Sequence, residues 1–433
     1  MEILALGEKI KRRRKELSMT LKDLAGDRIT PGQISLVESG RSNPSMDLLE
    51  YLAGALETTV EYLMESEETQ AEKISIYYEQ VAESYILGGY YETGEKYIEN
   101  ALYYAEKYKI EYRKAKNLYL RANIFMAKGE LRLAQQFFLS ANVIFIKNNN
   151  YEDIVNTLLN LGKITLRLKA YHSSSSYLRQ AEKVYLDNEI GSEGLLGEIY
   201  YYMAEAYFKT EHINKAMDYS FLAKEKFKQV QDRKEYAKTL LILSEEYNKK
   251  GDLTNAIKYS QKTLDVYKEL DELNTMSEIE NNLGKLFYEF ENIEESFKHY
   301  EIAKSIRSRS NDNKIIETLL NIYENYIKLK NIDMCEEILG ELKKYLKEDD
   351  IRNIIEVNLL WYRLYIIKEM YKEAEDILID TYKLAKTNNL LNKAGQVAIM
   401  IGKYYIDNKK EFEAAKYLDE GVTIFRNIGV LKG

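Results

Sequence analysis

An internal repeat with a period of about 40 residues is the strongest constraint on what this chain can fold into. Each copy has a small residue, a bulky residue three positions later, a small residue nine positions after that, a bulky residue four further on, and another small residue three beyond. Two copies read Ala122, Phe125, Ala134, Phe138, Ala141 and Gly284, Phe287, Ser296, Tyr300, Ala303. The leading positions are 82, 122, 162, 204, 244, 284, 323, 362 and 402, and the copies at 82, 244, 323 and 362 fit the pattern less strictly. Repeats of this length predict a solenoid in which each unit packs on its neighbours.

The repeats resemble the tetratricopeptide repeat, in which each unit is a pair of antiparallel helices and the units stack into a right-handed superhelix. The standard unit has about 34 residues and often ends in proline. Here the units are longer, and the only two prolines of the 433 residues, Pro31 and Pro44, precede them. We expect longer helices joined by polar turns such as KGE, KGD and NKKE. Tyrosine, with 38 copies, is expected mainly to pack between helices.

Residues 1–64 lack this repeat and predict five short helices. Ile3, Leu6, Ile10 and Leu17 have helical spacing, and Thr20 begins a second helix. Thr30, Pro31 and Gln33 form a capping-box pattern with proline at the first helical position, and Gly40 ends that third helix. Ser45 caps a fourth helix, and Val60 to Met64 make a fifth. The two prolines thus belong to the boundaries of short helices.

This arrangement resembles the Cro/repressor-type helix-turn-helix domain, through Leu24-Ala25, Ile34-Ser35, Val37 to Gly40, Pro44-Ser45 and Leu56. The resemblance implies an ion pair between Arg14 and Glu38, and it places the third helix in the major groove of DNA. Two features differ from the family: Leu21 replaces a glutamine that usually contacts DNA, and the turn before Ile34 is one residue shorter. The candidate DNA-binding residues are Lys11, Arg12, Thr30, Gly32, Gln33, Ser35, Leu36, Ser39, Arg41, Ser42 and Asn43.

Two of these assignments have alternatives. Gln33 can pair with adenine through its amide, or it can serve only as a helix cap. Residues 1–64 have nine Lys or Arg against ten Asp or Glu, and six of the nine lie between Lys9 and Lys15. That basic run is either a solvated helix face or a phosphate-facing patch. The net charge of −8 argues against nonspecific binding of nucleic acid by the whole surface.

Three segments follow from these patterns: a DNA-binding domain at 1–64, an acidic linker at 65–73, and a repeat domain at 74–433 that binds peptide and dimerises. The linker sequence ESEETQAEK has no apolar period. It is either a solvated hinge or the first turn of the next helix. The expected fold class is all-α, with a five-helix Cro/repressor-type domain followed by a solenoid of about nine helix pairs.

The first helix of each repeat is expected to line a concave groove. In peptide-binding tetratricopeptide domains, an asparagine two residues before the small leading residue commonly holds the ligand backbone, because its amide both donates and accepts hydrogen bonds. Asparagine is also simply common in this position, so a packing role remains an alternative for each one. The candidate peptide-binding residues are Asn123, Asn156, Asn160, Lys163, Glu205, Glu245, Asn281, Asn282, Lys285, Asn321 and Asn325.

No pattern in the sequence predicts an enzyme, a cofactor or a metal site. His172, His212 and His299 fall in different repeats without metal-ligand spacing, and no phosphate-binding glycine loop is present. The single cysteine, Cys335, occupies a small-residue position and is expected to be buried. One cysteine cannot form an internal disulfide, and no apolar run reaches the roughly 20 residues that span a bilayer, so we expect a cytoplasmic protein without a membrane partner.

A helix-turn-helix module followed by long-period repeats resembles the peptide-sensing regulators of Gram-positive bacteria known as the RRNPP group. The resemblance implies a homodimer that binds double-stranded DNA at an inverted repeat, controlled by a short signalling peptide in the repeat groove. The Lys-, Asn- and Ile-rich composition also suits a low-GC organism. The resemblance implies closeness to the clostridial regulator of sporulation and toxin genes. The rival hypothesis is a scaffold whose repeats sequester a kinase or response regulator. In the resembling family the sequestering branch lacks the N-terminal module.

Overall fold

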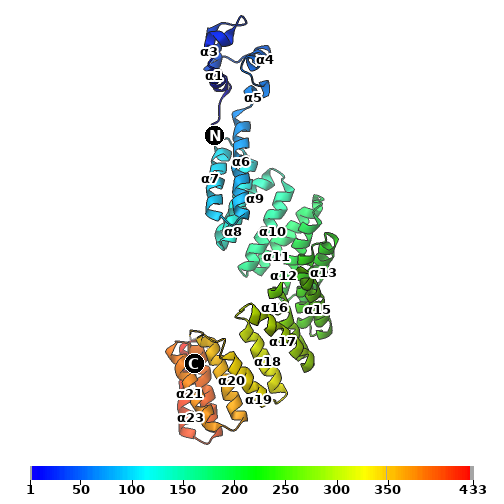
Figure 1. The fold of residues 1–433 in the computed structure, drawn as a ribbon, viewed down its shortest axis with the longest axis vertical. Helices are drawn as coiled ribbons and strands as arrows, with labels where there is room; N and C mark the ends of the chain where they lie inside the picture. The colour runs from blue at the N-terminus through cyan, green and yellow to red at the C-terminus, as the bar shows by residue number, and fades with distance from the viewer. Residues whose placement is uncertain (1, 348, 430–433) are drawn as a thin grey trace. The chain divides into compact units, whose positions relative to one another are not determined.

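The computed structural model describes residues 2–347 and 349–429, and its regular structure there is entirely α-helical (Figure 1). Packing of the backbone divides the chain into two compact units, the first ending at Asp232 and the second beginning at Arg233. The first unit holds five short helices and four helix pairs, and the second holds five helix pairs. Within the described residues, the predicted fold class is confirmed: a five-helix N-terminal domain precedes nine helix pairs.

The N-terminal domain forms because its short helices share one apolar core. Ile10, Leu24, Ile34, Leu52 and Leu56 are each 0% exposed and belong to this core. Side-chain caps set the helix starts: Thr20, Thr30, Ser45 and Thr59 each accept a hydrogen bond from a backbone N–H of the following turn. The helices are α1 (Leu6–Glu16), α2 (Leu21–Ala25), α3 (Pro31–Glu38), α4 (Met46–Ala55) and α5 (Val60–Met64).

The acidic stretch at 65–73 is almost wholly helical. Ser66 caps the helix α6 (Glu67–Leu87), so the second alternative, the first turns of the next helix, is what the structure adopts. The Gln70 side chain exchanges two hydrogen bonds with the backbone of Leu4, at 3.1 and 2.9 Å. The Lys9 ammonium donates to the carbonyl of Glu65 at 2.7 Å. The Gln70 bonds tie α6 to the N-terminal domain, and the Lys9 bond ties the residue two positions before α6 to it. The bounds of the three predicted segments stay a prediction.

The remaining helices come in antiparallel pairs, most of them 17 residues long, and in Figure 1 each pair lies side by side. In the first unit the pairs are α6 with α7 (Tyr91–Lys107), α8 (Glu111–Ala127) with α9 (Leu131–Lys147), α10 (Tyr151–Arg167) with α11 (Tyr171–Asp187), and α12 (Glu193–Lys209) with α13 (Ile213–Gln229). In the second they are α14 (Arg233–Lys249) with α15 (Leu253–Leu270), α16 (Leu273–Glu289) with α17 (Ile293–Arg309), α18 (Ile315–Lys328) with α19 (Ile332–Leu342), α20 (Ile351–Ile367) with α21 (Tyr371–Thr387), and α22 (Leu391–Asp407) with α23 (Glu411–Asn427).

The small leading residue of the repeat is needed where the two helices of a pair touch. A Cβ added at Gly162 would lie 2.7 Å from Leu178, and one added at Gly402 would lie 2.6 Å from Leu418. Both distances are far inside van der Waals contact. The bulky residue 16 positions later therefore packs directly onto the small one, which explains why these two positions repeat together.

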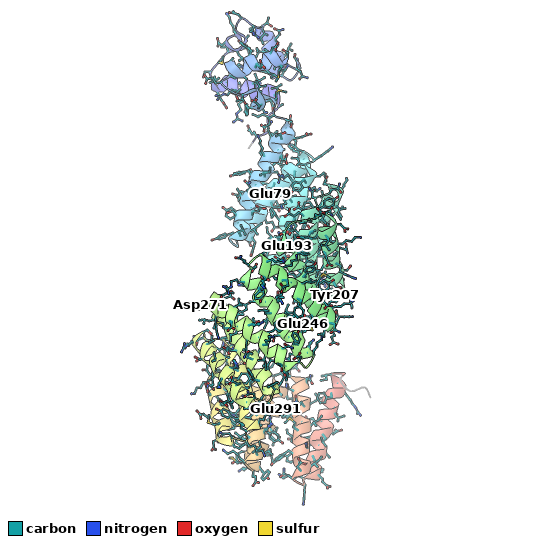
Figure 2. All side chains as sticks on the ribbon, turned by 90° about the vertical axis from the view of Figure 1, so that its right-hand side faces the viewer. Glu79, Glu193, Tyr207, Glu246, Asp271 and Glu291 are labelled. Carbon is teal, nitrogen blue, oxygen red and sulfur yellow. The ribbon has the colours of Figure 1, made fainter. Side chains whose placement is uncertain are left out.

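The aromatic residue three positions after the small one forms a stack within its helix pair. The ring of Tyr207 (Figure 2) lies 5.6 Å from that of Tyr219 with the planes 9° apart. Four other pairs repeat this geometry with the same 12-residue spacing: Tyr85–Tyr97, Phe125–Phe137, Tyr247–Tyr259 and Phe287–His299. Stacked rings of this kind add to the free energy of area burial. They account for part of the abundant tyrosine and confirm its packing role at these positions.

Candidate functional site

The helix α3 presents one exposed face while its other face is in the core. Ile34 and Val37 are 0% and 3% exposed. The residues predicted to contact DNA from this helix and its flanks are all exposed: Thr30, Gly32, Gln33, Ser35, Leu36, Ser39, Arg41, Ser42 and Asn43. Gly40 has a φ of +72°, which ends α3 and turns the chain into the exposed loop 41–43. The predicted accessible face of the third helix is therefore present in the structure.

The Gln33 side chain already has a structural task. Its Oε1 accepts a hydrogen bond from the backbone N–H of Thr30 at 2.9 Å, while the Thr30 hydroxyl accepts from the N–H of Gln33 at 3.3 Å. This is the predicted capping box. Bidentate pairing with adenine needs both Oε1 and Nε2, so base reading by Gln33 requires its amide to leave the cap.

A buried ion pair fixes α3 against α1. The Arg14 guanidinium donates to both carboxylate oxygens of Glu38, at 2.6 and 2.9 Å, and also to the carbonyl of Met19 at 2.8 Å. The two paired side chains are only 12% and 7% exposed, and the hydrogen bond to Glu38 raises the pKa of Arg14. Gly7 lies directly against the end of α3, since an added Cβ would overlap the carbonyl groups of Val37 and Glu38. The Arg14–Glu38 pair predicted from the sequence is confirmed.

The basic run from Lys9 to Lys15 is not one continuous patch. Lys9 is 1% exposed and donates to the carbonyls of Tyr62 and Glu65, and its burial lowers its pKa. Arg13 donates to the carbonyl of Leu56. Only Lys11, Arg12 and Lys15 are exposed, and Arg12 is paired with Glu2 and Glu16 at 3.2 Å. Neither alternative holds for the whole run, because Lys9, Arg13 and Arg14 bond groups of the domain itself. The two predicted DNA-binding residues of the run, Lys11 and Arg12, are among the exposed ones.

Lys11 is the exposed cation best placed to act together with α3. It lies one turn beyond Gly7, on the flank of α1 that touches α3. Arg12 lies on the neighbouring flank with Glu8 and Glu16, and these three residues line one surface hollow together with Leu4, Lys11 and Lys15. Carboxylates beside Arg12 weaken its attraction for phosphate, so Lys11 is the stronger candidate of the two.

In the first unit, the predicted groove asparagines are held by protein groups. The amide of Asn160 donates to the Tyr119 hydroxyl at 2.9 Å, and the Asn123 side chain lies near the same hydroxyl. Asn156 donates to the carbonyl of Glu152 in its own helix. Lys163 is paired with Glu198 at 2.5 Å. Glu205 is half-buried on α12. Tyr119 is thus a polar neighbour of both Asn160 and Asn123.

In the second unit, two predicted groove residues have packing roles instead. Asn325 is 0% exposed, and its amide donates to the Ser296 hydroxyl at 2.9 Å. Asn281 is 1% exposed, and its Oδ1 accepts from the amide of Asn321 at 3.3 Å. Both predictions are wrong in this structure, because neither Asn281 nor Asn325 is accessible to a ligand. Asn321 remains partly exposed at their edge.

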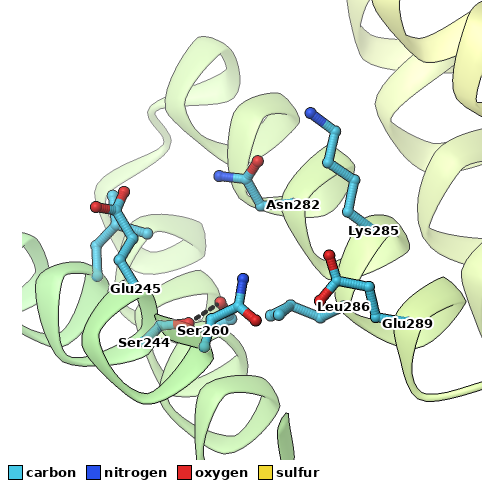
Figure 3. A pocket seen from close by; sticks show the side chains of 9 residues that line it. Ser244, Glu245, Ser260, Asn282, Lys285, Leu286 and Glu289 are labelled. Carbon is cyan, nitrogen blue, oxygen red and sulfur yellow. Dashed lines mark hydrogen bonds between the residues drawn. The ribbon is translucent and has the colours of Figure 1, made fainter. Parts of the chain in front are cut away.

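The other predicted residues of the second unit meet around one cavity of about 180 Å³ (Figure 3). Three of the predicted peptide-binding residues, Glu245 from α14 and Asn282 and Lys285 from α16, line it, and Figure 3 shows their side chains around the same space. The cavity is also lined by residues that the sequence reading missed: Leu241, Ser244, Asn248, Ser260, Leu286 and Glu289. Asn248 follows the small residue Ser244 by one turn, which is the signal that could have identified it.

Two amides are available to a ligand in this cavity. Asn282 and Asn248 come from neighbouring first helices, α16 and α14, and neither side-chain amide makes a hydrogen bond within the described residues. Amides on two such helices can donate to a peptide C=O and accept from its N–H. This pairing of partner-free amides is the arrangement expected of a backbone-binding groove.

In the described part of the chain, no group of three or more His, Cys, Asp or Glu is placed to hold a metal ion. His299 stacks on Phe287, and its Nδ1 lies 2.6 Å from Glu280. Cys335 is confirmed as buried at 0% exposure, and burial raises its pKa to about 11. No helix in the described ranges is long and apolar enough to cross a membrane.

Comparisons with known proteins agree with this geometry. A helix-turn-helix family model, HTH_3, matches residues 10–63. No curated protein matches the chain in sequence. Among solved structures, apo RapI has a TM-score of 0.59 at 14% identity and covers 82% of this chain and 98% of its own. The apo form of the quorum sensor NprR from B. thuringiensis has a TM-score of 0.52 at 14% identity, with 82% and 99% covered.

The third structure is the STAND signal-transduction ATPase with a tetratricopeptide-repeat sensor from Pyrococcus horikoshii. Its TM-score is 0.55 at 12% identity, and 99% of this chain and 74% of that one are covered. The chain is therefore a helix-turn-helix domain joined to a solenoid of tetratricopeptide type. Its fold is that of RapI and NprR, so the resemblance to RRNPP-type regulators is confirmed at the level of the fold. Closeness to the clostridial regulator stays a prediction.

Proposed function

We propose that this protein is a sequence-specific DNA-binding transcription regulator whose activity is controlled by a short signalling peptide bound to its repeats. The observation that carries the proposal is the pairing of two accessible surfaces in one chain. One is the exposed face of α3, fixed by the Arg14–Glu38 pair. The other is the cavity with the partner-free amides of Asn248 and Asn282.

The DNA partner follows from the first surface. A helix of this kind enters the major groove, and two copies in a homodimer meet two half-sites of an inverted repeat. Thr30, Gly32, Gln33, Ser35, Leu36 and Ser39 would face the bases or their flanks, and Lys11, Arg41, Ser42 and Asn43 would face phosphates. Arg12 would contribute less because of its ion pairs with Glu2 and Glu16.

Peptide control follows from the second surface. A ligand changes a conformational equilibrium only by as much as it prefers one arrangement over another. The α6 helix, whose Gln70 side chain is bonded to the backbone of Leu4 in the N-terminal domain, provides a physical connection through which the first repeats act on that domain. In this proposal the protein works in the cytoplasm as a quorum-sensing regulator of sporulation, toxin or virulence genes, without a catalytic step.

Selection of duplexes from a random-sequence pool by the full chain tests the DNA half. The wild type should enrich an inverted repeat. Lys11→Ala should weaken all duplexes alike and lower the slope of binding against salt by about one, as expected for a phosphate contact. Gln33→Ala should relax the preference at one base pair by about 1–3 kcal/mol. Gln33→Glu is the comparison variant, because it keeps the oxygen that accepts the hydrogen bond of the helix cap but lacks the amide N–H that would donate to the base. An unenriched pool would contradict DNA reading and favour the scaffold hypothesis.

Native mass spectrometry of protein purified from its own host tests the peptide half. The wild type should carry a short peptide in addition to the mass of the chain. The double variant Asn248→Ala/Asn282→Ala should lose that peptide and remain folded. Asn388→Ala is the matched control, because Asn388 is not a predicted groove residue and its exposed amide donates to the carbonyl of Leu384 four positions before it. Retention of the peptide by the double variant would show that the cavity is not its site.

A further inference from the structure

The two serine hydroxyls that line the cavity between α14, α15 and α16 can accept a hydrogen bond from a ligand but have no proton free to donate. Ser244 and Ser260 are 3% and 1% exposed, and their hydroxyl oxygens are 2.7 Å apart (Figure 3). The single hydroxyl proton of Ser244 is donated to the carbonyl of Ala256 at 2.8 Å. Ser260 must then donate its own proton to Ser244. Both hydroxyl protons are therefore used within the protein, so the Ser260 hydroxyl can only accept a hydrogen bond from a ligand.

The dimensions of the cavity suit one side chain. Its volume of about 180 Å³ is smaller than the roughly 300–1,000 Å³ of pockets that enclose a whole small molecule. The apolar part of its lining comes from Leu241 and Leu286. Long cationic side chains bury their methylene stems along apolar surface of this kind while the charged end reaches polar groups.

The charge of the lining favours a cation. Glu245 and Glu289 line the cavity together with one positive residue, Lys285. The Lys285 ammonium donates to Glu317 at 2.7 Å, and this pairing offsets its charge. Glu289 makes no ion pair within the described residues. An anionic ligand would therefore face the Glu289 carboxylate and an already paired lysine.

We propose that this cavity receives a lysine or arginine side chain of the bound peptide, with Glu289 facing the cation, the Ser260 hydroxyl accepting from it, and Leu241 and Leu286 packing on its stem. The inference rests on the proposed function, since the peptide backbone is held by Asn248 and Asn282. The inference adds the chemical class of one side chain of the peptide. Asn248 and Asn282 cannot distinguish that class, because they bind only the peptide backbone.

Affinity selection with mass spectrometry tests the inference on the full chain. The probe is a pool of hexapeptides with blocked termini and all residue types equally represented. Peptides retained by the wild type should be enriched about two- to fivefold in Lys and Arg, the range expected of an ion pair near the surface. Glu289→Gln should remove this enrichment without abolishing retention, and Glu289→Lys should replace it by enrichment in Asp and Glu.

Two comparisons separate the possible outcomes. Glu301→Lys makes the same change of net charge on the exposed side of α17 and should leave the enrichment as in the wild type. Retained peptides without cationic enrichment, or an enrichment that survives Glu289→Gln, would overturn the inference while peptide binding stands. If the wild type retained no peptide, the proposed peptide control itself would fail, and the inference with it.

Discussion

Arg14 and Glu38 are 24 positions apart, and the bond between them sets the position of α3. At the residue scale, the basic residues of α1 are of two kinds: those bonded within the domain and those exposed to solvent. Lys9, Arg13 and Arg14 satisfy backbone carbonyls or a buried carboxylate, whereas Lys11 is exposed on the α3 side of α1. The same run of basic residues therefore serves stability at some positions and is available for phosphate at others.

Removal of one partner of the buried pair should destabilise the N-terminal domain locally. Arg14→Ala leaves the Glu38 carboxylate without its cation, and the loss of one member of a buried pair costs about 3–5 kcal/mol. Hydrogen exchange in α1 and α3 of the full chain should accelerate by two orders of magnitude or more.

Arg12→Ala provides the control for that measurement, because its pairs with Glu2 and Glu16 are exposed. Such pairs contribute at most about 1 kcal/mol. Equal exchange rates in the two variants would show that the Arg14–Glu38 bond does not hold α3.

At the element scale, the turns between helices explain the absence of proline from the repeats. The turn after α8 is representative: Gly129 has a φ of +81° and donates to Met126, and Glu130 donates to Phe125. This is a Schellman motif, and proline after the left-handed residue would lose its second bond. Most turns use Lys, Asn, Glu, Asp or Gln at the left-handed position, for example Asn149, Lys169 and Lys409.

Replacement of glycine by alanine should lower the stability of the protein at one position of the helix pairs and raise it at another. Gly284→Ala places a Cβ on the ring of Tyr300, which is 2% exposed. Overpacking of this kind costs about 1–3 kcal/mol, so the midpoint of thermal unfolding followed by Trp361 fluorescence should fall. Gly340→Ala in α19 has open space around its Cβ and should raise stability by about 0.5–1 kcal/mol. A fall in both variants would contradict the packing described for Gly284.

At the scale of the whole molecule, the proposed function requires two copies of the chain on one operator. Two recognition helices reach successive major grooves when their half-sites are about 10–10.5 base pairs apart or a multiple of that spacing. A nuclease footprint of the full chain on a selected duplex should therefore show two protected half-sites related by inversion. Native mass spectrometry of the complex should give two chains per duplex, and one chain on one half-site would contradict the dimer.

The sequence by itself determined the repeat, the number of helix pairs and the caps of the N-terminal domain, and its resemblance to the Cro/repressor-type domain implied the Arg14–Glu38 pair. The first three depend on local spacing: small residues recur against bulky ones, and a cap lies three residues from its partner. Tertiary structure decided which polar side chains are free. Asn281, Asn282 and Asn325 all lie within three residues of a leading position, yet Asn281 and Asn325 are bonded and buried while Asn282 faces a cavity. The partner of an amide lies on another helix, about 30 to 40 positions away, and sequence periodicity carries no information on that contact.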